Sequence, residues 1–285
     1  MKIIFYYHIP ILKKNKKLFC PGFLGVFLDS LALEISQLTL LMHESNEKLD
    51  FNYQLKQKNI DFISLGEKKP AWHRILFHKS ILKKKLDAIK KNEILLVRSP
   101  SPLASYFNKY KGTKNLVYLV IGDYRDGARL MKVSSFRDLL VKNLMIYINY
   151  MFLKQLRNNH TIVNSKMLFE KYRHNCKKID LIKTTTLSQK DFFKRTDTCL
   201  NKKINLLYTG RIEREKGLFE LFNAFSQIRK KHKNIYLNIV GWEENPGKHI
   251  EKELRKISHS LEIENYITFH GYKNIGKELN EMYRM

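Results

Sequence analysis

The sequence contains little cysteine and no apolar run long enough to cross a membrane. Its 3 cysteines in 285 residues lack the spacing of a zinc site and fit a reducing cytoplasm: Cys20, Cys176 and Cys199. The most apolar stretch, Leu139 to Leu156, is interrupted by Lys142 and Lys154, whereas a spanning helix needs about 20 apolar residues. We therefore expect a cytoplasmic protein without a metal site, soluble or peripheral at the inner face of the plasma membrane.

Acidic residues are also scarce relative to basic ones. The chain has 53 Lys and Arg against 27 Asp and Glu, a formal net charge of +26. Such a charge attracts nucleic acid, acidic lipid headgroups or phosphorylated substrates, although coding bias on a solvated surface also produces it. No helix-turn-helix, zinc-binding or RNA-binding sheet pattern is present, and the basic residues are spread out. An anionic membrane surface and phosphorylated substrates are therefore the expected partners, and nucleic acid is not.

Short apolar runs rich in β-branched residues alternate with longer helical patterns along the chain. This alternation is typical of βαβ units that build parallel sheets, so the predicted fold class is α/β. In the first half the predicted strands are Lys2–Tyr7, Asp61–Leu65, Ile94–Arg98, Leu116–Ile121 and Thr161–Asn164. Helices are predicted over Phe27–Glu44 and Phe136–Asn158.

A polar segment interrupts this alternation and separates two predicted domains. We expect residues 1–183 to form a Rossmann-like first domain, residues 184–203 a linker, and residues 204–285 a partial second domain. The second domain should contain strands Ile204–Thr209, Ile235–Val240 and Tyr266–Phe269, with helices Leu218–Lys231, Ile250–His259 and one from Lys277. Three strands with two crossovers make half of a doubly wound sheet, and such sheets bind nucleotides where their halves meet.

The segment YTGRIEREKG joins an apolar strand to an amphipathic helix and carries glycine and two cations. Gly210 permits a tight turn at the strand end, while Arg211 and Lys216 lie close to a helix N-terminus. Unpaired amides at such a terminus favour anions, and arginine binds phosphate oxygens through a bidentate fork. The pattern predicts a diphosphate site made by these three residues. The alternative is a polar turn with surface ion pairs to Glu213 and Glu215.

This segment, the helix after it and the strands that end in LNIVG and ITFHG follow the order and spacing of a known family. From Ile204 to Tyr283 the sequence resembles the C-terminal domain of group 1, or family four, glycosyltransferases. The resemblance implies a GT-B fold with two Rossmann-like, doubly wound domains. In that family the residues corresponding to Arg211 and Lys216 bind the donor diphosphate, and the glycine corresponding to Gly241 ends a strand that faces the nucleotide.

The first half resembles the same family more loosely. The family carries a glycine-rich loop after the first strand, where PGFLGV stands here, so Gly22 and Gly25 are candidates to approach the donor phosphate; an ordinary flexible loop is the alternative. Many members have a histidine after the strand that corresponds to LVYLVI, where this sequence has GDYRD. Asp123 is therefore the candidate catalytic residue that hydrogen-bonds a sugar hydroxyl, or it pairs with Arg125 at a turn. His8, at the end of the first strand, is a further candidate or a structural histidine.

The resemblance stops before the family pattern is complete. The family's paired glutamates, which bind the donor sugar and ribose, lie beyond the next strand, and the sequence ends at Met285. The helix that commonly returns to the first domain is also missing. We therefore expect a truncated second domain with an uncovered strand edge, which favours poor solubility or completion by another chain.

The resemblance implies a retaining transfer of a sugar from a nucleoside diphosphate donor, with no cofactor beyond this donor substrate and no metal. The lack of an Asp-x-Asp pair fits metal independence. The expected acceptor is a glycan or a polyprenyl-diphosphate-linked sugar of the cell envelope. The basic and apolar segment Phe136–Arg157 lies in the headgroup region of a membrane or packs on the core. The rival functions are an inactive remnant or binding subunit of such an enzyme and a nucleic-acid-binding protein.

Overall fold

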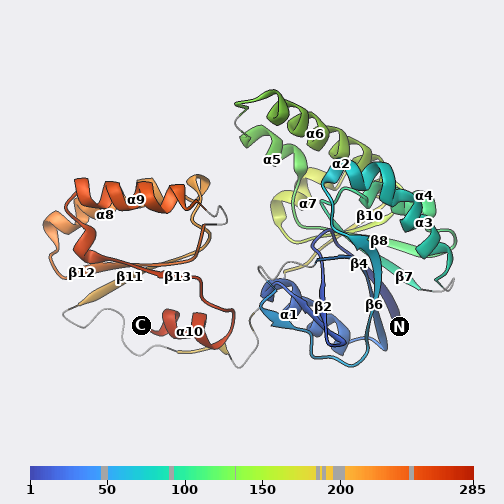
Figure 1. Ribbon diagram of the computed structural model, residues 1–285, viewed down its shortest axis with the longest axis horizontal. Coiled ribbons are helices and arrows are strands. Elements are labelled where there is room, and N and C mark those ends of the chain that lie inside the picture. Colours follow the sequence, from blue (N-terminus) through green and yellow to red (C-terminus); the bar gives the residue numbers. More distant parts are fainter. Residues whose placement is uncertain are drawn as a thin grey trace. The chain divides into compact units, whose positions relative to one another are not determined.

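The chain divides into two compact units, Met1–Thr186 and Leu187–Met285 (Figure 1). The computed structural model describes residues 1–45, 51–89, 93–131, 133–183, 187, 191–194, 203–243 and 247–285. The predicted linker, residues 184–203, falls largely outside these residues, and so does Cys199. Each unit is treated separately below.

The first unit is built on a parallel sheet that has seven strands in its described residues. The strand order is β10-β9-β8-β7-β1-β4-β6. All five strands predicted for this half are present, and two more join them, so that the sheet consists of β1 (Lys2–Tyr6), β4 (Gln37–Glu44), β6 (Ile60–Glu67), β7 (Ile94–Ser99), β8 (Asn115–Val120), β9 (His160–Val163) and β10 (Lys178–Leu181). The chain runs from β1 outward to β6 and then returns to β7 on the other side of β1. The strand order therefore reverses between β1 and β7, where doubly wound sheets bind ligands.

The predicted helix over Phe27–Glu44 is wrong in its second half. The helix α1 spans Gly22–Leu33, and the chain then enters β4, which pairs in parallel with both β1 and β6. Leu40 and Leu41 point to opposite faces of the sheet, and both are fully buried. A strand buried on both faces has a continuous apolar run, which periodicity does not distinguish from a buried helix.

Helices cover both faces of this sheet (Figure 1). One face packs against α3 (Lys79–Asp87), α4 (Ala104–Tyr110), α6 (Phe136–Leu156) and α7 (Lys166–Tyr172). The other face packs against α1 and a small antiparallel sheet of β2 (Leu12–Lys14), β3 (Lys17–Cys20) and β5 (Tyr53–Gln54). Side chains of β1 alternate between the two cores, with Ile4 in the first and Phe5 in the second, as the strand period of two requires.

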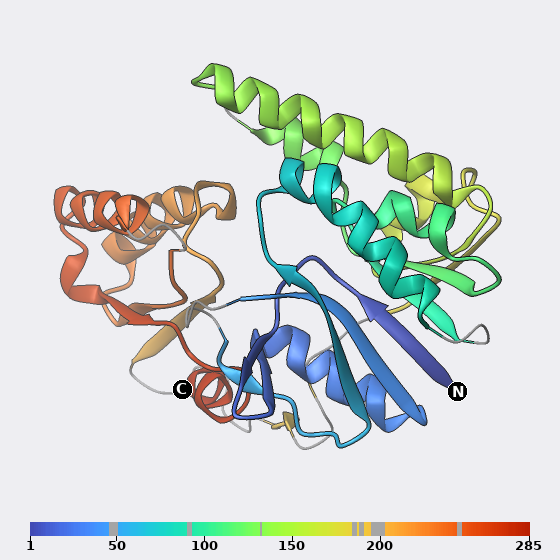
Figure 2. The ribbon, with the colours of Figure 1, turned by 45° about the vertical axis from the view of Figure 1, so that its right-hand side comes forward.

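The long helix α6 confirms the helix predicted over Phe136–Asn158 and has two different halves. Its carboxyl half packs on the core through Ile148, Phe152 and Leu156. Its amino half projects past the sheet (Figure 2) and exposes Phe136 by 74% and Leu140 by 55%. Packing on the core therefore accounts for the apolar residues in the carboxyl half of α6 only. Among the described helices, none is long and apolar enough to cross a membrane.

The second unit has a parallel sheet of three strands in its described residues, in the order β11-β12-β13. The strands are β11 (Ile204–Thr209), β12 (Ile235–Val240) and β13 (Ile267–Gly271), and the helices are α8 (Leu218–Lys231), α9 (His249–Ser260) and α10 (Lys277–Arg284). The first and last residues of these strands and helices agree with the predicted bounds to within two residues. Phe222 and Phe225 of α8 and Leu254 of α9 are buried against the sheet and form its core. In Figure 1, α8 and α9 cover one face of this sheet.

Candidate functional site

The carboxyl edge of the second unit's sheet is made of glycines that approach each other closely. Gly210 follows β11, Gly241 follows β12, and Gly271 ends β13. A Cβ atom on Gly241 would lie 1.7 Å from the carbonyl oxygen of Gly210, a distance that no side chain tolerates. The amide of Gly241 donates to the carbonyl of Gly271 at 2.9 Å, and that of Gly210 donates to the carbonyl of Val240 at 3.0 Å. Glycine is therefore required at position 241 to let the strand ends meet.

The loop between β11 and α8 presents the two predicted phosphate-binding cations at the surface. Ile212 anchors the loop, because it is buried and its amide donates to the carbonyl of Trp242 at 2.8 Å. Arg211 and Lys216 are exposed on either side of this anchor. Lys216 ends a short 3-10 turn, and Gly217, with φ of 70°, leads directly into α8. The structure thus places Lys216 at the N-terminus of α8.

An ion pair at this loop bears on the alternative interpretation of the motif. Arg211 Nη1 lies 3.0 Å from Glu213 Oε1, and the two side chains are 45% and 28% exposed. The polar turn with a surface ion pair is therefore present. Exposed pairs contribute about 0–1 kcal/mol, so a diphosphate with more charge can replace Glu213 as the partner of Arg211. Diphosphate binding by Gly210, Arg211 and Lys216 stays a prediction.

The segment with Gly22 and Gly25 is not a loop. It forms the first turn of α1, and its amides are used inside the unit: that of Gly22 donates to Asn52 Oδ1 at 2.9 Å, and that of Gly25 donates to the carbonyl of Pro21 at 2.9 Å. A Cβ atom on Gly25 would lie 2.1 Å from the ring of Tyr53. The expectation of a loop is therefore corrected, since Gly25 is needed for the contact between α1 and Tyr53.

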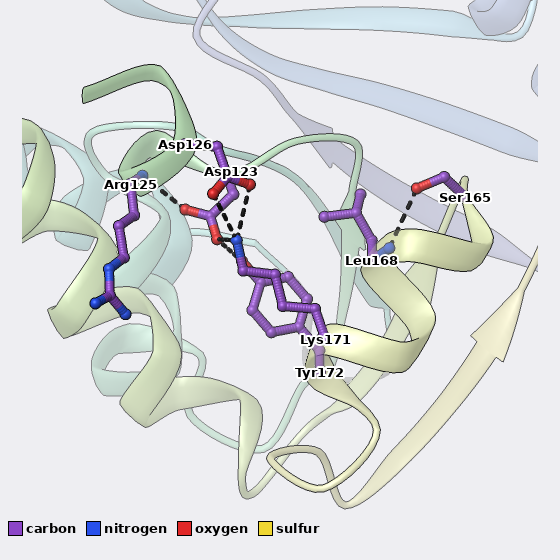
Figure 3. A network of polar contacts seen from close by, with 7 residues as sticks. All are labelled: Asp123, Arg125, Asp126, Ser165, Leu168, Lys171 and Tyr172. Carbon is purple, nitrogen blue, oxygen red and sulfur yellow. Dashed lines mark hydrogen bonds and ion pairs between the residues drawn. The ribbon is translucent and has the colours of Figure 1, made fainter. Parts of the chain in front are cut away.

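Asp123 begins the helix α5 (Tyr124–Leu130) and is the centre of a polar network (Figure 3). Its carboxylate accepts the amide of Arg125 at 2.6 Å and the hydroxyl of Tyr172, and it lies 2.5 Å from Lys171 Nζ. Lys171 also binds Asp126 at 2.7 Å. The partner in the ion pair is thus Lys171 of α7, not the Arg125 side chain that the sequence suggested. This network fastens α5 to α7.

The surroundings of Asp123 keep its carboxylate ionised. Burial raises its pKa, but hydrogen bonds from Lys171, Tyr172 and the amide of Arg125 outweigh burial and hold the pKa below its usual value. The side chain is only 1% exposed. The carboxylate therefore has a clear structural role, and its hydrogen bond to a sugar hydroxyl stays a prediction.

Replacing Asp123 should separate these two roles. We expect Asp123→Asn to lower the free energy of unfolding of the first unit by about 2 kcal/mol, because the Lys171 ammonium loses its buried counter-charge. Urea unfolding followed by Trp72 fluorescence, in a Trp242→Phe background, measures this. Asp126→Asn, at a carboxylate that is 39% exposed, is the control and should cost less than about 1 kcal/mol. Unchanged stability with lost sugar transfer would instead assign Asp123 to catalysis.

His8 follows β1 at the carboxyl edge of the first unit's sheet. Burial, and then the nearby positive charge of Arg74 and Lys68, lowers the pKa of His8 to about 3, so the ring is neutral. Sequence reasoning named His8 but missed the basic side chains that surround it, His43, Arg74 and His78. The run HRILFH, with two histidines and an arginine in six residues, was the available signal. In the described residues, no group of three histidine, cysteine or acidic side chains is placed to hold a metal ion.

The second unit is similar to a known protein family. Residues 189–285 match the family model of group 1 glycosyl transferases. The match contains the glycine edge of β11, β12 and β13 and the cationic loop before α8. No curated protein matches the chain.

Solved structures similar to this chain include glycosyltransferases, at low sequence identity. Sucrose-phosphate synthase from Thermosynechococcus elongatus has a TM-score of 0.62 at 15% identity, over 96% of this chain and 71% of that one. HepE from Anabaena, in complex with UDP-glucose, has a TM-score of 0.59 at 15% identity, over 99% and 71%. WaaG, a glycosyltransferase of lipopolysaccharide biosynthesis, has a TM-score of 0.62 at 11% identity, over 98% and 71%. These similarities confirm the predicted α/β fold of the GT-B type.

Proposed function

We propose that the chain is a glycosyltransferase that uses a nucleoside diphosphate sugar as donor. This proposal rests on one observation: the family match over residues 189–285 contains the turn between β11 and α8, where the phosphate-binding residues are predicted. In that site a glycine edge removes side chains from the strand ends, and Arg211 and Lys216 stand before the N-terminus of α8. Backbone amides and two cations are suited to a diphosphate.

The same groups suit the chemical step. When the bond from the sugar to the diphosphate breaks, negative charge grows on the leaving oxygen. Arg211, Lys216 and the first amides of α8 stabilise this charge, and Ile212 already anchors the loop that carries both cations. We propose that the transfer retains the anomeric configuration and needs no metal or further cofactor, as the sequence resemblance implies.

A uridine nucleotide is the first donor to test, because HepE was solved with UDP-glucose. We expect isothermal titration to detect binding of UDP or a UDP-sugar to the full chain, and at least tenfold weaker binding to the Arg211→Ala, Lys216→Ala double variant. The control, Lys230→Ala with Lys231→Ala, removes the same charge from exposed positions at the other end of α8. GDP and its sugar conjugates serve as competing donors. Equal binding by all three proteins would reject the diphosphate site, and no binding of any nucleotide by the folded chain would favour the inactive remnant.

We further propose that the acceptor is a glycan or a polyprenyl-diphosphate-linked sugar of the cell envelope, reached by a peripheral protein at the inner membrane face. The support is the exposed amino half of α6, where Phe136, Leu139 and Leu140 stand beside Arg137 and Lys142. Sedimentation with phosphatidylglycerol vesicles tests this placement. Protein that stays wholly in the supernatant at low salt would contradict it.

A further inference from the structure

Basic side chains are buried together at the carboxyl edge of the first unit's sheet, apart from the Asp123 network. His8 follows β1, and His43 lies on β4. The others lie on the continuous helical segment after β6, which consists of α2 (Ala71–His73), the π-helical turn η1 (Arg74–His78) and α3. His43 is fully buried, and Arg74 and His78 are 5% and 6% exposed. The ring centres of His43 and His78 are 5.1 Å apart, and those of His73 and His78 are 5.3 Å apart.

These side chains lack the hydrogen-bond partners that buried polar groups require. Among the described residues, no hydrogen bond of good geometry reaches Arg74 Nε and Nη1, either ring nitrogen of His43, or Nδ1 of His8, His73 and His78. The backbone of Gly66 lies close enough to His43, and that of Pro100 close enough to His8, to favour the protonated ring, but neither outweighs the effect of burial. Buried arginines are normally paired with an acid, because an unpaired charge away from water is strongly unfavourable. Arg74 and these histidines therefore have donor groups that an anion would satisfy.

The charged side chains around the cluster also favour an anion. The pKa of His43 falls to about 3, first through burial, then through the positive charge of Arg74 and the nearby titratable rings of His78 and His8, while the backbone of Gly66 acts in the opposite direction. For His8 the charged neighbours after burial are Arg74, Lys68 and Arg98. For His78 they are His73, Arg74 and Lys69. Every charged side chain that shifts these three histidines is basic, so the site has a positive potential and presents neutral imidazoles that are able to donate N–H groups.

The position in the fold also suits a ligand. The strand order reverses between β1 and β7, and ligands bind outside the carboxyl ends of strands at such a point. At the end of β7, Ser99 is fully buried and its hydroxyl has no partner in the described part of the chain. The hydroxyl of Ser101 donates to that of Tyr6 at 2.9 Å. The π-helical turn that carries Arg74 and His78 is itself a rare geometry that is frequent at functional sites.

We propose that His8, His43, Arg74 and His78 bind a phosphate group. Donors converge here from β1, β4 and η1, and a tetrahedral phosphate with three free oxygens satisfies donors from several directions better than a planar carboxylate does. If the chain is a glycosyltransferase, this phosphate belongs to the acceptor, so that assignment rests on the proposed function. The phosphate site itself does not depend on it.

Inorganic phosphate is the probe for the test, at constant ionic strength because the chain carries a net charge of +26. The full chain with Arg211→Ala and Lys216→Ala serves as the background, so that the proposed donor site does not contribute. We expect phosphate to bind in this background, and Arg74→Gln to weaken the binding at least tenfold. Lys84→Gln, which removes an equal charge from the exposed face of α3, should leave it unchanged. His43→Leu, which changes no formal charge at neutral pH, should also weaken it.

Thermal unfolding without phosphate separates a ligand residue from a structural one. Arg74→Gln should unfold at the same or a higher temperature than the parent, because it removes an uncompensated buried charge. Lower stability of Arg74→Gln, or phosphate binding equal to that of Lys84→Gln, would overturn the proposal. Displacement of phosphate by glucose 6-phosphate would indicate a soluble phosphate ester as the ligand, and displacement by vesicles with phosphatidic acid would indicate a lipid phosphate. Nucleotide binding measured in the chain with intact Arg211 and Lys216 reports on the proposed donor function separately.

Discussion

Gly241→Ala is expected to destabilise the second unit by about 3 kcal/mol or more. A Cβ atom would lie 1.7 Å from the carbonyl oxygen of Gly210, and both backbones are fixed by the pairing of β11 with β12. Because neither strand end can move without breaking hydrogen bonds, the clash cannot relax cheaply. Urea unfolding followed by the fluorescence of Trp242, in a Trp72→Phe background, measures the loss in this unit alone.

Gly271→Ala is the matched control in the same sheet. Its φ of 69° is unfavourable for alanine, but nothing lies within 4 Å of the added Cβ atom. It should therefore cost only about 1–2 kcal/mol, the strain of a left-handed residue. If Gly241→Ala is no worse than this control but loses nucleotide binding, the glycine serves ligand approach and not strand packing.

Acid should destabilise the first unit well before its carboxylates are protonated. The pKa of His8 and of His43 is about 3 in the folded protein, against about 6.5 in an unfolded chain. As the pH falls below about 6.5, the unfolded chain takes up protons that the folded unit does not. Full stability is therefore present above this pH. Below it, each histidine lowers the free energy of unfolding by up to about 1.4 kcal/mol per pH unit.

The groups that face these histidines make the effect stronger, since three of them are cationic: Arg74 of η1, Lys68 after β6 and Arg98 of β7. The fourth, His78 of η1, has a lowered pKa itself and adds to the same pH dependence. Asp123 contributes separately and later, because its lowered pKa keeps it ionised until below its unfolded value of about 3.8. Measurements between pH 6.5 and 4.5 therefore isolate the histidines.

Urea unfolding at several pH values, with Trp72 as the reporter in a Trp242→Phe background, provides the measurement. Trp72 is suited to it because its ring lies 5.6 Å from that of His73. His43→Leu is expected to reduce the slope, because it removes one of the three histidines of the cluster whose pKa is lowered. Saturating phosphate should also reduce the slope if the proposed site is occupied. A flat profile in the parent between pH 6.5 and 4.5 would show that these histidines are protonated in the folded unit.

The proposed donor site and the proposed phosphate site lie on different units, and their tests fail independently. Loss of nucleotide binding in the Arg211 and Lys216 double variant concerns the second unit only. Loss of phosphate binding in Arg74→Gln concerns the first. If both losses are observed, the protein has two anion sites, which gives its positive net charge a specific use beyond general attraction to a surface.

The sequence by itself determined the secondary structure of the second unit and the nature of its motif. The strands and helices from Ile204 to Arg284 follow local patterns of apolar residues, and the glycine and cations before α8 are neighbours along the chain. Their arrangement depends on only a few consecutive residues. Local sequence was therefore sufficient to predict the strand-to-helix turn and to place Arg211 and Lys216 beside it.

Tertiary structure decided what depends on residues far apart in the sequence. The segment Gln37–Glu44 became a strand because β1 and β6 pair with it on both sides. Asp123 is bound by residues 48 and 49 positions away, and position 25 of α1 requires glycine because the ring of Tyr53 leaves no room for a Cβ atom. The buried basic cluster likewise joins residues from β1, β4 and η1. No local pattern contains these contacts, because each arises only when the sheet and its helices pack.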